Sequence, residues 1–466
     1  MLKIITSDDP VLKKLFPRFF GRHRPEKITP EIKTKVAEII AAVEREGDEA
    51  LLRFTSEFDQ INLPAAQLTV KKEEIKAAHR EVSPSYLTAL ASAKENIVSF
   101  HQSQLAGQAS LPEANSWFET NALGVFLGQM VRPLDRVGIY VPGGTAAYPS
   151  SVLMCALPAK VAGVKEIALV TPPQKNGKVN PHVLAAAALS GVEEIYRVGG
   201  AQAIAALAYG TETIKPVDKI VGPGNLYVTL AKQLVYGQVD IDLLAGPSEV
   251  LIIADELAKA PYIAADLLAQ AEHDSQAVAI LLTPDSRLAG RVLKEIARQI
   301  ISLPRQEIIS QALRENGAIV ITRNLKEAFA LANCFAPEHL ELMVGAVNQT
   351  PLPFSHRSSD VRRQEKNIPW LESVVNAGAV FLGSYSPEAA GDYLAGPSHV
   401  LPTGGTARFY SSLNVATFLK KSSVIAYPPE ALIQEGPKII RLALTEGLTA
   451  HAQAVKIRME QDDDAI

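Results

Sequence analysis

The sequence predicts an α/β fold in which two adjacent, doubly wound domains, variants of the Rossmann type, follow an N-terminal helical segment and precede a C-terminal helical tail. One observation is that, from about residue 136, short β-branched runs ending in glycine or proline turns alternate with alanine-rich helical stretches. Another is that this alternation runs through two successive series. Strands separated by helices pair in parallel through right-handed crossovers, so each series predicts one sheet.

Helical periodicity dominates the chain before the first strand. Around Ile32, Val36 and Ile40, apolar residues recur three or four positions apart, with charged residues between them. We assign residues 1–32 to an N-terminal segment and expect 33–135 to contain a helical lead-in with a charged exposed face.

The two series of strands define the two domains. The first contains VGIYV, EIALVT, EIYRV and DKIV, each followed by a turn and a helix, and gives a domain over 136–247. The second contains EVLIIAD, QAVAILLTP, AIVITR and GAVFLG. We expect residues 248–412 to join 33–135 in a discontinuous α/β domain, with a ligand cleft between the two domains.

Two further segments stand outside this pattern. A polar stretch near 345–369, rich in Pro, Ser and Arg, is typical of a surface excursion. Residues 413–466 predict a helical tail whose two helices are too small to bury their apolar faces alone. We therefore expect the tail to pack on the body of the protein or on another subunit.

Composition narrows the functional classes. The 466-residue chain has a net charge of −4 with interspersed signs, which gives no reason to expect a nucleic-acid partner. Charge interrupts the N-terminal MLKIITSDDPVLKK, and no apolar run has the length of a membrane span. Two cysteines, Cys155 and Cys334, lie in apolar helical stretches and are expected in the core. Together these features indicate a cytoplasmic protein without a membrane partner.

Several polar residues are candidates for chemistry. Gln270 and His273 lie three apart on one predicted helix, although a single helical histidine is more often a solvent or core residue. Glu338 and His339 follow a proline and suit acid–base work, or else a polar helix end. The remaining candidates, each with an equally ordinary structural explanation, are Asp392 and His399 in a Gly/Pro-rich loop and Glu446 and His451 in the tail.

Glycine turns follow the strands of the first series. VPGG, VGGAQ and VGPGN can line a cofactor cleft or can simply begin helices, and their geometry alone does not choose. The G-x-G-x-x-G fingerprint of dinucleotide-binding domains does not follow any strand here.

The motifs together resemble one family. VGIYVPGG, VGGAQAIAALAYGT, DKIVGPGN, AGPSEVL, DLLAQAEHD, APEHLE, NAGAVFLG, GDYLAGPSHVLPT and LTAH occur in the order seen in histidinol dehydrogenases. The resemblance runs from the N-terminal helices to His451. It implies a zinc enzyme, with one Zn²⁺ per subunit, that oxidises L-histidinol to L-histidinaldehyde and then to L-histidine with two NAD. These are the last steps of histidine biosynthesis.

The same resemblance implies roles for residues. The metal ligands would be Gln270, His273, Asp392 and His451, of which His451 comes from the other subunit of a homodimer whose tails are exchanged. Glu338 and His339 would be the acid–base pair: His339 takes the hydroxyl proton and Glu338 activates water. The substrate contacts would be Ser248, Gln270, His273, His339, Asp392, His399, Glu446 and His451, with Glu446 also crossing the interface. The NAD contacts in 136–247 would be Tyr140, Gln202 and Asn225.

The chain departs from the family pattern at 345–369, where roughly 20 residues are added. We interpret the addition as a surface loop; the alternative is that its Arg and His side chains cap the cleft or contact a partner. Three other functions remain open from the residues themselves: a metal-dependent dehydrogenase of a different amino alcohol, a solute-binding protein, and a non-catalytic homologue. A solute-binding protein would need an export signal and no acid–base pair, and a non-catalytic homologue would have lost a site residue.

Overall fold

A computed structural model describes residues 2–20, 29–105, 116–143, 147–345, 368 and 370–460. It divides into two compact units. We name Met1–His101 with Asp135–Thr417 the core unit, and Gln102–Leu134 with Phe418–Ile466 the tail unit. The core unit contains two parallel sheets, and the tail unit contains a small antiparallel one.

Sheet B, the five-stranded sheet of the core unit, has the order β6-β5-β4-β7-β8, and all its strand pairs are parallel. The chain moves outward from β4 to β6 and then returns to β7 on the other side, as in a doubly wound dinucleotide-binding fold. Its strands are β4 (Arg136–Tyr140), β5 (Glu166–Thr171), β6 (Glu194–Arg197), β7 (Lys219–Val221) and β8 (Asp240–Ile241), and its crossover helices are α6 (Pro149–Val161), α7 (Pro181–Leu189), α8 (Gly200–Tyr209) and α9 (Leu226–Val235).

Sheet A, the six-stranded sheet, repeats this winding. Its order is β1-β11-β10-β9-β12-β13, again all parallel, so the five strands that follow sheet B in sequence have the same order as sheet B and a sixth strand is added at one edge. The elements are β1 (Lys3–Thr6), β9 (Glu249–Ala254), α10 (Ala260–Ala271), β10 (Val278–Thr283), α11 (Ser286–Gln299), α12 (Gln306–Asn316), β11 (Gly317–Ile321), α13 (Leu325–Phe335), β12 (His339–Met343), β13 (Ala379–Leu382) and α16 (Glu388–Tyr393).

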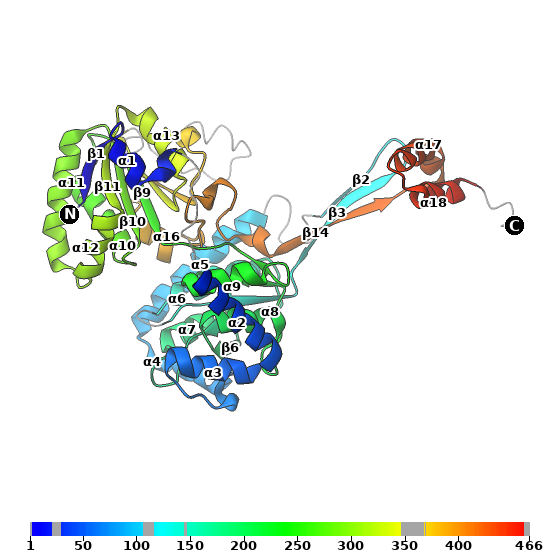
Figure 1. Ribbon diagram of the computed structural model, residues 1–466, viewed down its shortest axis with the longest axis horizontal. Coiled ribbons are helices and arrows are strands. Elements are labelled where there is room, and N and C mark those ends of the chain that lie inside the picture. Colours follow the sequence, from blue (N-terminus) through cyan, green and yellow to red (C-terminus); the bar gives the residue numbers. More distant parts are fainter. Residues whose placement is uncertain are drawn as a thin grey trace. The chain divides into compact units, whose positions relative to one another are not determined.

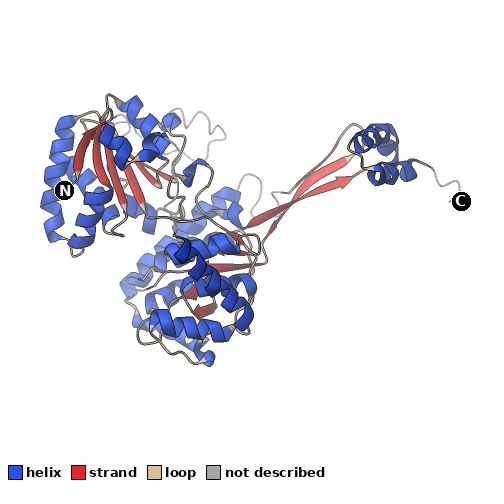
Figure 2. Cartoon of the chain, in the orientation of Figure 1, coloured by secondary structure: helices blue, strands red, loops and turns tan. Residues whose placement is uncertain are grey.

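Sheet A is buried on both faces, and the residues of β9 show how. Val250 and Ile252 pack among residues of α10, α11 and α12, whereas Leu251 and Ile253 pack among α1 (Pro10–Leu15), the 3-10 helix η1 (Pro17–Phe20) and α13. Successive strand residues point to opposite faces, so a strand with helices on both sides must be apolar throughout. Figure 1 and Figure 2 show these strands between their helical layers.

The helical lead-in packs on sheet B. Apolar residues of α2 (Pro30–Glu46) and α3 (Asp48–Asp59) share one core cluster with residues of α8, α9 and β5. α4 (Lys72–Glu81) lies against α7, and α5 (Pro84–Leu105) follows it. This differs from the expected grouping of 33–135 with 248–412, because periodicity identifies an apolar helix face but not the sheet that receives it. The N-terminal segment also differs from expectation, since it supplies the edge strand β1.

The tail unit combines strands with helices. β2 (Trp117–Thr120), β3 (Phe126–Pro133) and β14 (Leu419–Ala426) form an antiparallel sheet, sheet C, and α17 (Pro429–Thr445) packs against α18 (Thr449–Met459). The expected tail of 413–466 was helical only, so its first element, a strand, is a difference. Exposed apolar side chains in this unit include Ile425, Leu442 and Ile457, which are 66%, 67% and 61% exposed.

The two cysteines differ in burial. Cys155 is buried as expected, but Cys334 is exposed on α13, so the expectation of a core position is wrong for Cys334. Among the described helices, none combines the length and apolar character needed to cross a bilayer. The expected loop at 345–369 falls almost wholly outside the described residues.

Candidate functional site

The candidate site lies at the amino-terminal edge of sheet A. Ser248 directly precedes β9, and Glu338 and His339 stand at the start of β12, the strand paired with β9. α10 and α16 run back toward the same edge and bring Gln270, His273 and Asp392 with them. Ligands of doubly wound sheets usually bind at the opposite, carboxyl-terminal edge. This site differs, because its residues lie in the loops and helix ends around the amino-terminal edge of sheet A.

His339 has a fixed tautomer. Its Nδ1 lies 3.1 Å from the backbone oxygen of Glu249, which can only accept, so Nδ1 carries the hydrogen. Nε2 is therefore an unprotonated acceptor, and it lies 3.9 Å from Oδ1 of Asp392. Burial lowers the pKa of His339 to about 3, which keeps the imidazole neutral. The tautomer thus leaves Nε2 as the one ring nitrogen of His339 that can accept a proton.

Glu338 is held by the same residue as His339. Its carboxylate accepts a hydrogen bond of 2.8 Å from the backbone N–H of Glu249, and its Oε2 lies 3.7 Å from Nδ1 of His339. Burial raises the pKa of Glu338, and the backbone hydrogen bond opposes that rise. A carboxyl whose pKa is raised suits transfer of a proton near neutral pH.

A cluster of possible metal ligands lies beside this pair. One donor atom each from His273, Glu388 and Asp392 lies within 4.8 Å of the others. Gln270 is fully buried on α10, and neither its Oε1 nor its Nε2 has a hydrogen-bond partner among the described residues. A buried amide without partners costs free energy unless a ligand satisfies it. Oxygen and nitrogen donors of this kind fit a borderline cation such as Zn²⁺.

Burial also controls the charges of this cluster. It raises the pKa of Asp392 to about 6 and raises that of Glu388 as well. A bound divalent cation would act in the opposite direction, because it favours the ionised carboxylates. The acidic cluster is therefore most stable when a cation balances it.

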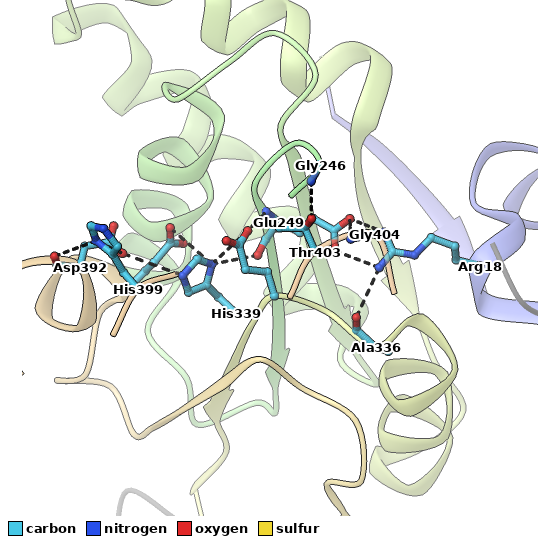
Figure 3. Close-up of polar contacts among 11 residues, drawn as sticks. Arg18, Gly246, Glu249, Ala336, His339, Asp392, His399, Thr403 and Gly404 are labelled. Atoms are coloured by element: carbon cyan, nitrogen blue, oxygen red, sulfur yellow. Dashed lines mark hydrogen bonds and ion pairs between the residues drawn. The ribbon is translucent and has the colours of Figure 1, made fainter. Parts of the chain in front are cut away.

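His399 connects this edge to sheet B. Its Nδ1 lies 3.1 Å from the backbone oxygen of Asp392, and its Nε2 lies 3.3 Å from the hydroxyl of Ser151 on α6. Next to it, the Ser398 hydroxyl donates to the backbone oxygen of Met154, also on α6. Since α6 begins just beyond β4, these contacts bring the start of sheet A to the carboxyl-terminal edge of sheet B. Figure 3 shows Asp392 and His399 next to each other at this edge, with His339 beside them.

The carboxyl-terminal edge of sheet B holds the three predicted cofactor contacts. Tyr140 ends β4, and its hydroxyl accepts a hydrogen bond of 3.1 Å from the backbone N–H of Gly200. Gln202 lies in the first turn of α8, buried, and its Oε1 has no partner among the described residues. Asn225 caps α9 through its side chain. β4 and β7 are adjacent and lead to opposite sides of the sheet, so this edge is the topological switch point.

The family model of histidinol dehydrogenase matches residues 22–353 and 362–459. The chain belongs to the histidinol dehydrogenase family. The resemblance, the α/β fold and the dehydrogenase class predicted from the sequence are thereby confirmed.

Individual members of the histidinol dehydrogenase family are similar over almost the whole chain. The histidinol dehydrogenase of Moorella thermoacetica is 56% identical over 429 residues, which cover 92% of this chain and 95% of that one. That of Gloeobacter violaceus is 50% identical over 463 residues, covering 99% and 97%. The crystal structure of the enzyme from Elizabethkingia anophelis, at 37% identity, covers 98% of each chain with a TM-score of 0.85. Membership of the histidinol dehydrogenase family implies the use of NAD and of a metal.

The predicted site residues of this histidinol dehydrogenase family member fall into two groups. Those of the core unit come together at the two facing edges just described. Glu446 and His451 belong to the tail unit, where Glu446 directly follows α17 and His451 is exposed on α18. Sequence reasoning missed Glu388, whose Oε1 lies 3.7 Å from Nδ1 of His339. Its signal was the spacing of four residues from Asp392, which places both carboxylates on one helix face.

Proposed function

We propose that the protein uses NAD and one Zn²⁺ per subunit to oxidise L-histidinol through L-histidinaldehyde to L-histidine, in the cytoplasm. The observation that supports this most directly is His339: a buried, neutral imidazole whose free Nε2 points toward an acidic N/O cluster. An alcohol becomes an aldehyde only when it loses a proton and a hydride, so a proton acceptor beside a cofactor edge is the minimal requirement.

The fully buried Gln270 amide and the His273 and Asp392 donors support a metal site, and His451 from a second copy would complete it. The cation would hold the imidazole and amino nitrogens of the substrate in place, and two NAD would each accept one hydride, in succession. Gln270 gains most from this arrangement, because it would exchange an unpartnered buried amide for a ligand bond.

The chain's own residues handle the protons. In the first oxidation, Nε2 of His339 takes the hydroxyl proton of the substrate. In the second, Glu338 takes a proton from the water that adds to the aldehyde carbon, and the resulting hydrate is oxidised to the carboxylate. Ser248, His399 and Glu446 would contact the substrate. The hydrogen bond between His399 and Ser151 would keep the His399 side chain directed toward the carboxyl-terminal edge of sheet B, where NAD would bind.

Tyr140, Gln202 and Asn225 would bind NAD within residues 136–247. Their placement at the switch point of sheet B supports this role, as does the unpartnered Oε1 of Gln202. Glycine turns at these positions let the cofactor approach the backbone closely even without the usual fingerprint.

Apolar residues exposed on the tail unit support a homodimer in which Glu446 and His451 act in the partner's site. Leu442 and Ile457, on α17 and α18, are 67% and 61% exposed. Large apolar side chains that are exposed close together usually mark a surface that another protein covers. A second subunit would cover this surface in a homodimer.

The proposed chemistry is tested by the yield of NADH per histidinol in the presence and absence of a chelator, alongside other amino alcohols. We expect two NADH for each histidinol, loss of activity on metal removal and recovery with Zn²⁺. His339→Asn should lower kcat by about 10³-fold or more and leave the zinc content unchanged. A single NADH per histidinol, or a His339→Asn variant with full activity, would contradict the proposal.

The shared site is tested by mixing two inactive variants, His339→Asn and His451→Asn, and letting subunits exchange. If His451 acts in the partner's site, each mixed dimer has one site with both native histidines, and an equal mixture recovers about a quarter of the wild-type activity. If His451 acts within its own subunit, the mixture stays inactive. Subunit exchange is checked separately, by recovery of untagged His451→Asn subunits with affinity-tagged His339→Asn subunits from the mixture.

A further inference from the structure

We propose that Arg18, in the 3-10 helix η1 near the N-terminus, is a positioning residue for Glu338 and His339. The proposal rests on the catalytic roles proposed above for these two residues. Arg18 is separated from them by more than three hundred residues of sequence, and it does not touch either side chain in the contacts that the structure describes.

The guanidinium of Arg18 is buried, and both of its terminal nitrogens are hydrogen-bonded, whereas Nε has no partner among the described residues. It forms a two-point ion pair with Glu249, in which Nη1 meets Oε1 and Nη2 lies 2.8 Å from Oε2. Nη2 also donates to the backbone oxygens of Phe335 at 2.8 Å and Ala336 at 3.4 Å. The guanidinium carbon lies 3.8 Å from the centre of the Phe335 ring. Figure 3 shows Arg18 directed at Glu249 and Ala336.

Glu249 transmits this contact to both proposed catalytic groups. Its backbone N–H donates to the carboxylate of Glu338, and its backbone oxygen accepts from Nδ1 of His339. One residue therefore orients both groups with its main chain, while its side chain is fixed by Arg18 and by the backbone N–H of Gly404. A shift of Glu249 would move Glu338 and His339 together.

Ala336 provides a second route from Arg18 to the site. It ends α13 in the left-handed conformation, with φ of +52°, and Pro337 and Glu338 follow it directly. A non-glycine residue in this conformation is strained and persists only when its surroundings hold it. The hydrogen bonds from Arg18 to the carbonyls of Phe335 and Ala336 are part of that restraint, and they set the point at which the chain enters β12.

A second buried arginine offers a matched control. Arg136 begins β4, and its side chain is 9% exposed, as is that of Arg18. It pairs with Glu194 and Glu166, and like Arg18 it joins its glutamate through two nitrogens. Arg136 lies at the amino-terminal edge of sheet B, opposite to the edge with Tyr140, so its loss removes a buried ion pair without reaching either proposed site.

The experiment compares Arg18→Met, Arg18→Lys and the double variant Arg18→Met/Glu249→Gln with Arg136→Met. The double variant removes the unpaired buried carboxylate that Arg18→Met alone would leave, while the backbone groups of Glu249 remain. For each folded protein, kcat, the KM values for histidinol and NAD, bound zinc and Tm are measured.

We expect Arg18→Met and the double variant to lower kcat by about tenfold to a hundredfold, with both KM values changed less than about threefold and the zinc content unchanged, because misplaced catalytic groups slow chemistry more than binding. Arg18→Lys should recover part of kcat, since one ammonium can reach fewer of the four acceptors. Arg136→Met should lower Tm and leave kcat near that of the wild type.

Two results would overturn the proposal: a double variant with wild-type kcat, or an Arg136→Met variant whose kcat falls as far as that of Arg18→Met. His339→Asn, assayed in the same series, separates this proposal from the proposed function. If His339→Asn is inactive while the double variant turns over normally, only the role of Arg18 fails; if His339→Asn is fully active, the catalytic assignment itself fails.

Discussion

At the scale of single residues, the site consists of polar groups whose burial favours their uncharged forms or leaves them without hydrogen-bond partners. His339 is neutral, Glu338 and Asp392 have raised pKa values, and the amide of Gln270 has no partner among the described residues. Such an arrangement is unfavourable for the empty protein and favourable once ligands bind, because the same low-dielectric surroundings strengthen each new contact.

Substitution of Gln270 gives the clearest test of this unfavourable free energy. In Gln270→Leu, an apolar side chain replaces the unpartnered amide, so the metal-free variant should be more stable than the metal-free wild type by about 1 to 3 kcal/mol. Zinc affinity should fall at the same time. Thermal unfolding of both proteins in chelator, followed by zinc titration, measures the two effects; a variant that loses stability without metal would contradict the interpretation.

Asp59 makes a prediction about pH. It ends α3, its Oδ2 is buried without a partner among the described residues, and burial raises its pKa from 3.8 to about 6. Ionisation therefore costs the folded state free energy, so the contribution of this group to stability falls as pH rises through the window from about 4 to 6.

Asp59→Asn should accordingly raise the free energy of unfolding at pH 8 by about 1 kcal/mol, after allowance for solvent screening of a partly exposed carboxylate. The gain should disappear near pH 3, where the carboxyl is mostly protonated in both the folded and the unfolded wild type. Denaturant unfolding at the two pH values measures it, with Glu57→Gln, on the exposed side of the same helix, as the control. An equal gain at both pH values would count against the assignment.

At the scale of elements, the loop after β7 is fixed by a buried ion pair. Lys232 on α9 pairs with Asp242, and both side chains are only 2% exposed. Lys232 donates to the backbone oxygen of Gly222 at 3.0 Å, and Asp242 accepts from the N–H of Gly222 at 2.7 Å. Gly222 has φ of +111°, and a Cβ there would lie 2.2 Å from the oxygen of Tyr140, so the loop has little freedom.

Because Asn225 follows in the same loop, Lys232→Met should raise the KM for NAD by about tenfold while the KM for histidinol and the zinc content stay unchanged. The expected size corresponds to about 1.4 kcal/mol of lost binding free energy. Steady-state kinetics with NAD as the varied substrate measures it. Lys219→Met, which removes a paired lysine from the opposite end of β7, is the control. Equal changes in both KM values would exclude a local effect on the cofactor loop.

The elements also show what the sequence can and cannot predict. Eight of the eleven described strands of sheets A and B were predicted, because most are β-branched runs followed by a turn and a helix, a pattern contained within a short window. The edge strands β1 and β8 are short, and β12 contains polar residues, so these three were not predicted. Sheet C was not predicted, because β3 pairs with β14 across nearly three hundred residues and neither strand is apolar throughout. The packing of α2 and α3 on sheet B was missed for a similar reason, since it depends on contacts remote in sequence.

The candidate site divides in the same way. Residues within the long motifs, such as His273, His339 and Asp392, were identified from the resemblance, and the geometry of the core unit brings them together. Arg18 and Glu249 were not identified, because their contribution depends on hydrogen bonds between segments far apart in the chain. Such contacts leave no local pattern.

At the scale of the whole molecule, the core unit consists of two sheets that share the same strand order but contribute opposite edges to the proposed sites. Sheet B offers its carboxyl-terminal edge and sheet A its amino-terminal edge, and His399 joins them through Ser151. At the carboxyl-terminal edge of sheet A, the contact of interest stabilises the fold. There, Asp255 at the end of β9 accepts from the backbone N–H of Gly345, just before the predicted insertion.

This placement predicts that deletion of residues 350–367 leaves turnover and dimerisation unchanged. Gly345 lies beyond the carboxyl end of β12, roughly 20 Å along the strand from His339 at the other end. After the segment, Trp370 stacks on Phe329 at 5.2 Å and provides a separate anchor for the returning chain. Steady-state kinetics and size-exclusion chromatography test the prediction; a large fall in kcat or a monomeric variant would support a capping or partner role for the segment instead.

The edge strand β1 has a consequence for how the protein is made. Residues Lys3–Thr6 are synthesised long before their partner β11, which begins only at Gly317. At usual rates of translation, about 310 further residues take roughly 15 to 60 seconds. Throughout that time the nascent N-terminus, with Arg18 close behind it, has no sheet to join, so the proposed positioning of Glu338 and His339 would be completed only after most of the chain has been synthesised.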